Sequence, residues 1–292
     1  MSSLPIGEYA LLSDRHSAAL VSSGGSVDWL CMPRFDSPSI FAAILDDEAG
    51  HWSIRPDADF RVEREYVAGS MVLLTKFHTS AGTLELRDTL ALGDTHNPHS
   101  LGEHAPHLLA RTATCTRGSI DVIMSFRARP EYGLVAPVTT AVDGGLVAIG
   151  GANLLTLSST VPLEVKRDEA NARFELGSGE RTCFALQYSA LGAATPELRT
   201  GPEISALVDQ TVTGSGVVGA PPELPRPLVR PRAPFRTSAA GAQLPAHRRD
   251  RRRTHHLPAR ASRRRTELGL PLLLGPRREH DHAGTVGRRV SR

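Results

Sequence analysis

Five residues near the start of the chain combine charge with aromatic surface: Asp28, Trp29, Arg34, Phe35 and Asp36. Such side chains suit sugar hydroxyls or an interface with another domain, because rings supply apolar contact and charged groups supply directional hydrogen bonds. A structural interpretation stands beside this one: a strand followed by a turn, with Arg34 paired to a nearby carboxylate. We predict these five residues as candidate contacts for a substrate or a neighbouring domain, with the structural alternative open.

Four histidines, His96, His99, His104 and His107, lie close together in the sequence and invite a metal-binding interpretation. Their spacing matches no standard zinc site, and the Gly, Asp, Asn and Pro around them are typical of a loop. The glycine pairs elsewhere lack the strand–loop–helix context of a phosphate-binding loop. We therefore expect a solvated loop at the histidines, with no metal and no cofactor.

The segments that would position these side chains alternate between apolar and polar residues with a period near two. Leu84 and Leu86 are separated by polar neighbours, which directs one face to a core and one to water. The Ser-Ala-Gly turn at residues 80–82 follows another β-type run at 71–79, so this region predicts a hairpin. Further strands are expected at residues 120–126, 145–149, 154–165, 172–176 and 182–188.

Short strands separated by Gly, Asn, Asp and Pro predict an all-β fold, an antiparallel β-sandwich. Only residues 39–45 and 201–213 are expected to be helical. In the second segment, Pro202 suits the first turn, and Ile204, Leu207 and Val208 share one face at helical spacing.

The charge is distributed unevenly along the chain. The total is near neutral, with 34 Lys and Arg against 31 Asp and Glu. Residues 215–292 nevertheless carry 18 arginines, no lysine and 5 acidic residues, a net charge of +13, which leaves −10 for residues 1–214. This tail is rich in Pro and Arg and has little apolar material to bury, so we expect it to be irregular and disordered.

The three cysteines, Cys31, Cys115 and Cys183, are scattered and odd in number, which favours free, buried thiols in a reducing compartment. The first residues show neither a basic region nor an apolar stretch typical of a signal peptide. The longest apolar run in the tail, at residues 268–275, is too short to span a bilayer. We expect a cytoplasmic protein with no membrane partner.

Several stretches closely resemble the N-terminal domain of bacterial glycoside hydrolase family 15, which includes trehalases and glucoamylases. The first 50 residues are the most specific, above all Gly-Ser-Val-Asp-Trp-Leu-Cys-Met-Pro-Arg-Phe-Asp-Ser-Pro-Ser-Ile-Phe at residues 25–41. The similar stretches lie at residues 6–14, 18–21, 25–41, 50–54, 126–133, 155–159 and 161–163. The resemblance runs from about residue 4 to residue 212 in family order.

The resemblance implies a β-sandwich of the supersandwich type over residues 1–200, a linker helix at 201–214, and a separate (α/α) barrel that carries both catalytic carboxylic acids. One acid protonates the leaving oxygen while the other activates water from the opposite side. Neither acid belongs to the N-terminal domain, so no catalytic residue carries over to this chain. The implied function is that of a non-catalytic domain, inactive alone, whose parent enzyme hydrolyses trehalose or an α-glucan with inversion.

A frameshift near Gly214 would account for the tail. With suitable synonymous codons, residues 253–260 shifted by one base become Ala-Pro-Thr-Thr-Ser-Leu-Pro-Glu, and residues 267–275 in the same offset become Asn-Trp-Asp-Tyr-Arg-Tyr-Cys-Trp. Both strings are similar to segments that follow the linker helix in the family. We therefore predict that residues 215–292 are an out-of-frame product, unselected as a folding sequence.

Two alternatives to this function stay open. In the first, the sandwich is a carbohydrate-binding module in its own right. In the second, the basic tail binds nucleic acid by neutralising its phosphates. The absence of lysine among 18 basic residues is unusual for a nucleic-acid arm, so we expect no specific nucleic-acid partner. The expected partners are the absent catalytic barrel and, at most weakly, an α-glucoside sugar.

Overall fold

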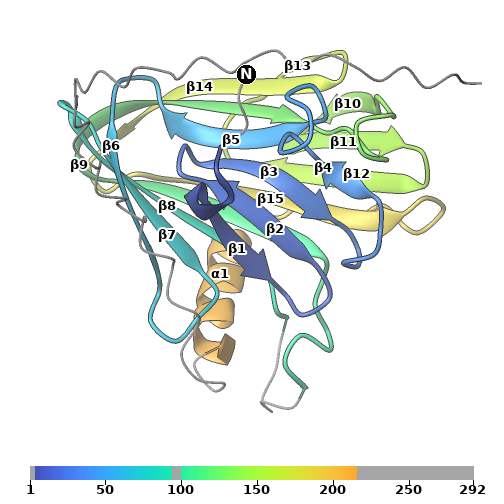
Figure 1. Ribbon diagram of the computed structural model, residues 1–292. Helices are drawn as coiled ribbons and strands as arrows, with labels where there is room; N and C mark the ends of the chain where they lie inside the picture. The colour runs from blue at the N-terminus through green and yellow to red at the C-terminus, as the bar shows by residue number, and fades with distance from the viewer. Residues whose placement is uncertain (1–3, 94–99, 216–292) are drawn as a thin grey trace, which may run out of the picture. The chain divides into compact units, whose positions relative to one another are not determined.

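The computed structural model describes residues 4–93 and 100–215, which form fifteen antiparallel β-strands, a short 3-10 helix and one α-helix (Figure 1). The elements are η1 (Ile6–Glu8), β1 (Tyr9–Ser13), β2 (Ala18–Ser22), β3 (Ser26–Cys31), β4 (Ser39–Phe41), β5 (His51–Pro56), β6 (Arg61–Tyr66), β7 (Leu73–His78), β8 (Gly82–Leu90), β9 (Leu108–Arg127), β10 (Val138–Val142), β11 (Gly145–Gly150), β12 (Asn153–Ser159), β13 (Glu164–Lys166), β14 (Glu169–Gly177), β15 (Arg181–Ala190) and α1 (Gly201–Ser215). Two of the four histidines, His96 and His99, and the basic tail beyond residue 215 lie outside the described residues.

The strands expected from alternation are present. The predicted hairpin is confirmed, with β7 and β8 paired so that His78 lies opposite Thr83. Four more expected runs lie within β9, β11, β14 and β15. The run at residues 154–165 divides into β12 and β13, because Pro162 has no N–H to donate to a ladder and interrupts the pairing.

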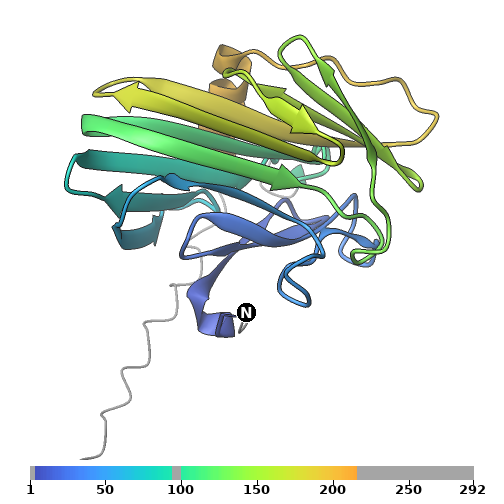
Figure 2. The same ribbon diagram turned by 90° about the horizontal axis from the view of Figure 1, so that it is seen from above.

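Strand β9 belongs to both layers of the fold. Its first half pairs with β8 and β15, in the sheet that we call sheet B. Its second half pairs with β5 and β14, in the sheet that we call sheet A, and β14 lies beside it in Figure 2. Sheet A also holds β1–β4 and β13, and sheet B also holds β6, β7 and β10–β12.

Gly118 lies where β9 passes from one sheet to the other. Its φ is +75°, and the pairing with β8 shifts register between Thr83 and Leu84. A Cβ atom at Gly118 would lie 1.9 Å from the carbonyl oxygen of Ala81. Only glycine combines this backbone angle with this close approach, so the bulge that turns β9 between the sheets depends on it.

The core lies between the two sheets. Trp52 of sheet A is fully buried, and its ring meets Phe126 of sheet A at 5.9 Å and Phe184 of sheet B at 6.5 Å, both edge to face. Leu155 and Leu186 pack into the same core from sheet B. The expected antiparallel sandwich is therefore confirmed. The three cysteines are free and buried, as predicted.

The helix predicted at residues 39–45 is wrong. Residues Ser39–Phe41 form β4, with Phe41 opposite Leu30 of β3, and all three are buried. A turn follows, closed by a bond from the N–H of Ala42 to the carbonyl of Ala49 at 2.9 Å. Seven residues are too few to form a stable helix alone, so the burial of Ile40 and Phe41 against the sheet decides the conformation.

Helix α1 covers part of the outer face of sheet B (Figure 1). Ile204 and Val208 are buried against Cys183 and Ala185 of β15. Before the helix, Thr200 donates from its backbone N–H and its hydroxyl to the Glu203 carboxylate, at 2.7 and 2.8 Å, and the first of these is the glutamate half of a capping box. No described helix combines the length and the apolar character needed to cross a bilayer.

Candidate functional site

Four small polar residues lie side by side on the outer face of sheet A, the face turned away from the core. Ser26 lies opposite Ser53, Ser53 opposite Ser125, and Ser125 opposite Asn171, across β3, β5, β9 and β14. Their chain neighbours, such as Trp52, point into the core, so alternation forces these side chains outward. We call these four residues the polar row.

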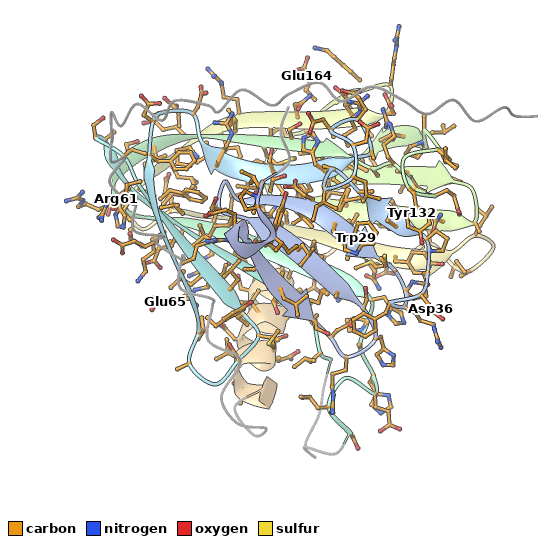
Figure 3. The ribbon with its side chains drawn as sticks, viewed as in Figure 1. Trp29, Asp36, Arg61, Glu65, Tyr132 and Glu164 are labelled. Atoms are coloured by element: carbon orange, nitrogen blue, oxygen red, sulfur yellow. The ribbon has the colours of Figure 1, made fainter. Side chains whose placement is uncertain are left out.

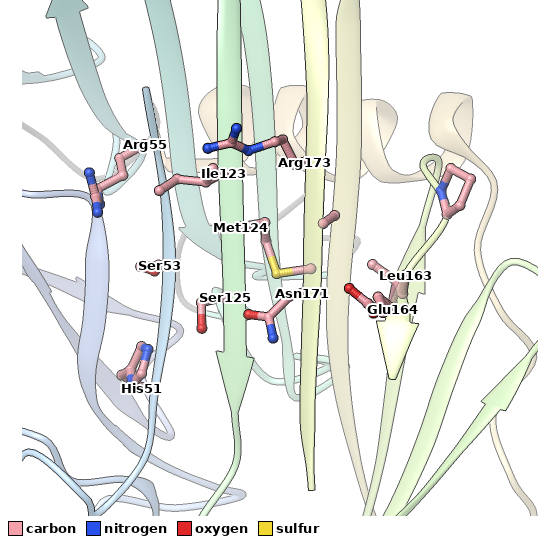
Figure 4. A pocket seen from close by; sticks show the side chains of 12 residues that line it. His51, Ser53, Arg55, Ile123, Met124, Ser125, Leu163, Glu164, Asn171 and Arg173 are labelled. Carbon is pink, nitrogen blue, oxygen red and sulfur yellow. The ribbon is translucent and has the colours of Figure 1, made fainter. Parts of the chain in front are cut away.

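An open groove of about 880 Å³ lies along the polar row (Figure 4). Ser53, Ser125 and Asn171 line it, together with His51 at the start of β5. Figure 4 shows Arg55 on the β5 side and Glu164 on the β13 side. The groove therefore presents neutral hydrogen-bonding groups at its centre and single charges of opposite sign at its margins.

Most charged groups beside the groove are paired within the protein, including Glu164 with Lys166 at 2.6 Å. Arg127 contacts Glu48 at 2.7 Å and Glu169 at 3.3 Å. Arg173 forms an ion pair with Asp57. These pairs hold the loop before β5 and the strand β14 against β9, and they leave little uncompensated charge around the polar row.

The surroundings of His51 favour its neutral form. Burial lowers the pKa of His51 below its ordinary value of 6.5, and the positive charge of Arg127 acts in the same direction. The carboxylates of Asp28, Glu169 and Glu48 oppose that shift without reversing it. A neutral imidazole has one donor and one acceptor nitrogen, so His51 can both give and receive a hydrogen bond.

Asp28, one of the five predicted site residues, lies in β3 near His51. Its carboxylate accepts hydrogen bonds from the Tyr9 hydroxyl at 3.1 Å and the Ser26 hydroxyl at 2.5 Å. Burial raises the pKa of Asp28, and those two bonds oppose the shift. Burial, with the nearby Asp28 charge, raises the pKa of Tyr9 to about 12. Much of the bonding capacity of Asp28 is therefore used within its own domain.

Trp29 lies beside Tyr132, and the two rings are 6.2 Å apart (Figure 3). Tyr132 is 48 % exposed. The φ angles of Glu131, Tyr132 and Gly133 are +60°, +59° and +94°. Two consecutive non-glycine residues in the left-handed region carry backbone strain, which the surrounding structure must hold in place.

Arg129 is one of the groups that hold this turn. It is 7 % exposed, and its backbone N–H donates to the carbonyl of Ile40 at 3.0 Å. Its guanidinium forms an ion pair with Asp168, and its carbonyl accepts from the N–H of Gly133 at 3.1 Å. The turn therefore presents Tyr132 next to Trp29 in a fixed position.

The remaining predicted residues lie in the exposed loop after β3. Arg34 donates to Asp36 through two bonds, at 2.8 and 3.2 Å, and Phe35 between them is 58 % exposed. This is the pairing of Arg34 with a nearby carboxylate that the structural alternative predicts. The structure thus joins Arg34 to Asp36 within a turn and places Asp28 and Trp29 on β3. Their role as contacts for a substrate or domain stays a prediction.

The residues of the groove were not predicted from the sequence. Alternation in the β5, β9 and β14 segments could have assigned Ser53, Ser125 and Asn171 to the polar phase of each strand. It could not align the three strands, because long connections separate them and register sets which residues meet.

Within residues 4–93 and 100–215, no group of three or more His, Cys, Asp or Glu side chains could hold a metal ion. His104 is exposed, and His107 meets the ring of His16 edge to face at 5.8 Å. The lining of the groove includes one carboxylate, Glu164. Inverting hydrolysis of a glycoside needs two carboxyl groups about 6.5–9.5 Å apart. The groove can bind through hydrogen bonds, but it does not supply that pair.

Comparison with known proteins finds relatives for the part of the chain that forms the sandwich. The family model "Trehalase-like, N-terminal" matches residues 1–180. Trehalase of Mycolicibacterium smegmatis is 34 % identical over 203 residues, and the match covers 63 % of this chain and 30 % of that enzyme. Trehalase of Mycobacterium tuberculosis gives the same identity and the same coverage.

A shorter match is closer in sequence. Trehalase 2 of Sulfolobus acidocaldarius is 44 % identical over 85 residues, which is 29 % of this chain and 14 % of that enzyme. This chain spans less than a third of the length of these curated relatives.

Proposed function

This chain belongs to the trehalase-like N-terminal family, and from that premise we propose that it is the non-catalytic domain of a trehalase-type or glucoamylase-type glycoside hydrolase. The parent activity would be inverting hydrolysis of an α-glucoside, trehalose or an α-glucan. The observation that carries the proposal is the extent of the match: it covers 30 % of each mycobacterial trehalase.

The chemistry of the described residues supports the same proposal. A proton donor and a water-activating carboxylate must face each other across the scissile bond. In the groove of sheet A, Glu164 is 66 % exposed at the side chain and forms an ion pair with Lys166 at 2.6 Å. Glu164 is the one carboxylate in the lining of the groove, so the groove offers no second acid to complete a catalytic pair.

Two assays test the proposal. We expect no glucose release from trehalose or maltose by the purified chain, under conditions in which the M. smegmatis enzyme is active. Replacing the matched region of that enzyme by residues 1–214 of this chain should give a chimaera that still hydrolyses trehalose. Glucose release by the isolated chain would refute the non-catalytic role, and a folded but inactive chimaera would count against the domain assignment.

The second candidate, a carbohydrate-binding module in its own right, is favoured by the groove along the polar row. Its side chains supply both donors and acceptors, as sugar hydroxyls require. The two candidates are compatible, since a domain of a hydrolase can also bind sugar.

A further inference from the structure

The groove of sheet A contains hydrogen-bonding groups that the protein itself does not use. Within the described ranges, the side chains of His51, Ser53, Ser125 and Asn171 have no hydrogen-bond partner in the protein. All four are half-buried. None of their polar atoms is among the buried atoms that lack a partner, so these groups are open to water and free to bond a ligand that displaces it.

The outer face of sheet B shows what an ordinary solvated face of this fold contains. On β6 and β7, away from α1, the outward residues include charged pairs: Lys76 with Glu65 at 3.0 Å, and Arg61 with Glu63 at 3.0 Å. Figure 3 places Arg61 and Glu65 together, far along the surface from Glu164. The polar row differs because its groups are neutral and small, and three of its four members, Ser53, Ser125 and Asn171, are unpaired at the side chain.

The chemistry of these groups selects the class of ligand. A serine hydroxyl, an asparagine amide and a neutral imidazole each offer a donor and an acceptor, which matches a ligand whose own groups do both. Arg173 and Arg127 are neutralised by Asp57 and by Glu48 and Glu169. At the margins, Glu164 is paired with Lys166 at 2.6 Å and Arg55 is exposed, so the groove has no cluster of positive charge that would select an anion.

We propose that this groove is a binding site for a neutral, hydroxyl-rich saccharide of two or more units. The proposal of a saccharide, rather than another polyol, rests on the proposed function. A volume of about 880 Å³ accommodates such a ligand. The lining contains no Trp, Tyr or Phe ring on which a sugar could stack. Binding is therefore weak, with a Kd on the order of 1 mM.

The test is an NMR titration of the full chain with trehalose, maltose and inorganic phosphate, each added separately. The chemical shifts of the backbone amides are the readout. Saturable shifts with a disaccharide, centred on Ser53, Ser125 and Asn171, are expected. The double variant Ser125→Ala/Asn171→Ala should weaken binding about tenfold or more, because several bonds to the sugar are lost. Equal unfolding midpoints of variant and wild type would show that the fold is kept.

The matched control is the double variant Ser178→Ala/Gln187→Ala. Ser178 is exposed at the turn between β14 and β15, and Gln187 lies in β15 of sheet B, so this variant should bind as the wild type does. The proposal fails if neither disaccharide gives saturable shifts, if phosphate binds more tightly than both, or if the shifts centre elsewhere. Those failures leave the non-catalytic role intact, and glucose release would refute that role without bearing on the titration.

Discussion

Arg111 donates to both carboxylate oxygens of Asp88, at 2.8 and 3.3 Å, and neither side chain is exposed. The two residues lie directly opposite each other in β9 and β8. Arg111 also donates to the carbonyls of Trp52 at 2.6 Å and Gly25 at 2.7 Å, and its guanidinium carbon lies 5.0 Å from the centre of the Trp52 ring. One side chain of sheet B thereby binds the backbone of sheet A across the core.

Replacing Asp88 by Asn should destabilise the domain strongly. The substitution removes the counter-charge and leaves a buried guanidinium, which costs about 3–5 kcal/mol in the free energy of unfolding. Urea unfolding followed by tryptophan fluorescence measures this. The control is Asp36→Asn, which breaks the exposed Arg34–Asp36 pair and should leave the midpoint unchanged. Similar midpoints for the two variants would contradict the role given to Asp88.

Gly118→Ala should destabilise the domain through two separable effects. Its φ of +75° strains any residue with a Cβ atom, and that atom would also clash with the Ala81 carbonyl. Gly179 has a φ of +88° with nothing within 4 Å of an added Cβ, so Gly179→Ala isolates the strain alone. We expect about 1 kcal/mol for Gly179→Ala and at least 1–2 kcal/mol more for Gly118→Ala. Equal losses of stability would show that the close approach at β9 is unimportant.

Asp88 and Arg111 also show how much of the core could be predicted from the sequence. Alternation with Leu84, Leu86 and Leu90 already places Asp88 on the core side of its strand, which marks it as a buried charge. Its partner could not be identified, because the connection from β8 to β9 is long and no local rule fixes the register. The same limit applies to Ser53, Ser125 and Asn171.

Sequence patterns predicted secondary structure correctly where the interactions that stabilise it join residues close in the sequence. The hairpin β7–β8 has its turn in sequence, and α1 has its capping residues and apolar face within a few turns. Residues 39–45 failed as a helix because tertiary burial of Ile40 and Phe41 overrides weak propensity. The five predicted site residues were chosen because they combine charge with aromatic surface, and the structure shows a turn pair, Arg34 with Asp36, and two residues on β3.

His51 should make the stability of the domain depend on pH in the neutral range. Burial lowers the pKa of His51 in the folded state below 6.5, so the unfolded chain binds more protons as the pH falls through 6.5. The folded state therefore loses stability below pH 6.5 and keeps this contribution above it. His51→Gln removes the titrating group while keeping a polar side chain.

The measurement is the difference in Tm between His51→Gln and the wild type at about pH 7.5 and about pH 5.5. Relative to the wild type, the Tm of His51→Gln should be higher at about pH 5.5 than at about pH 7.5, because only the wild type loses stability through this histidine. His107, whose pKa burial also lowers, is present in both proteins and cancels from the comparison. A difference that does not change with pH would contradict the assigned shift at His51.

The last prediction concerns the gene. If residues 215–292 are out of frame, the nucleotide sequence after the codon for Gly214 should contain a single-base offset that restores both family-like strings in one frame. A segment that has never been selected as protein has no consistent pattern for a core to use, so its removal should not affect the sandwich. A chain ending at Ser215 should unfold at the same urea concentration as the full chain. The hypothesis is refuted if no single-base offset restores the two strings, and a large fall in the midpoint on truncation would show that the tail contributes to the fold.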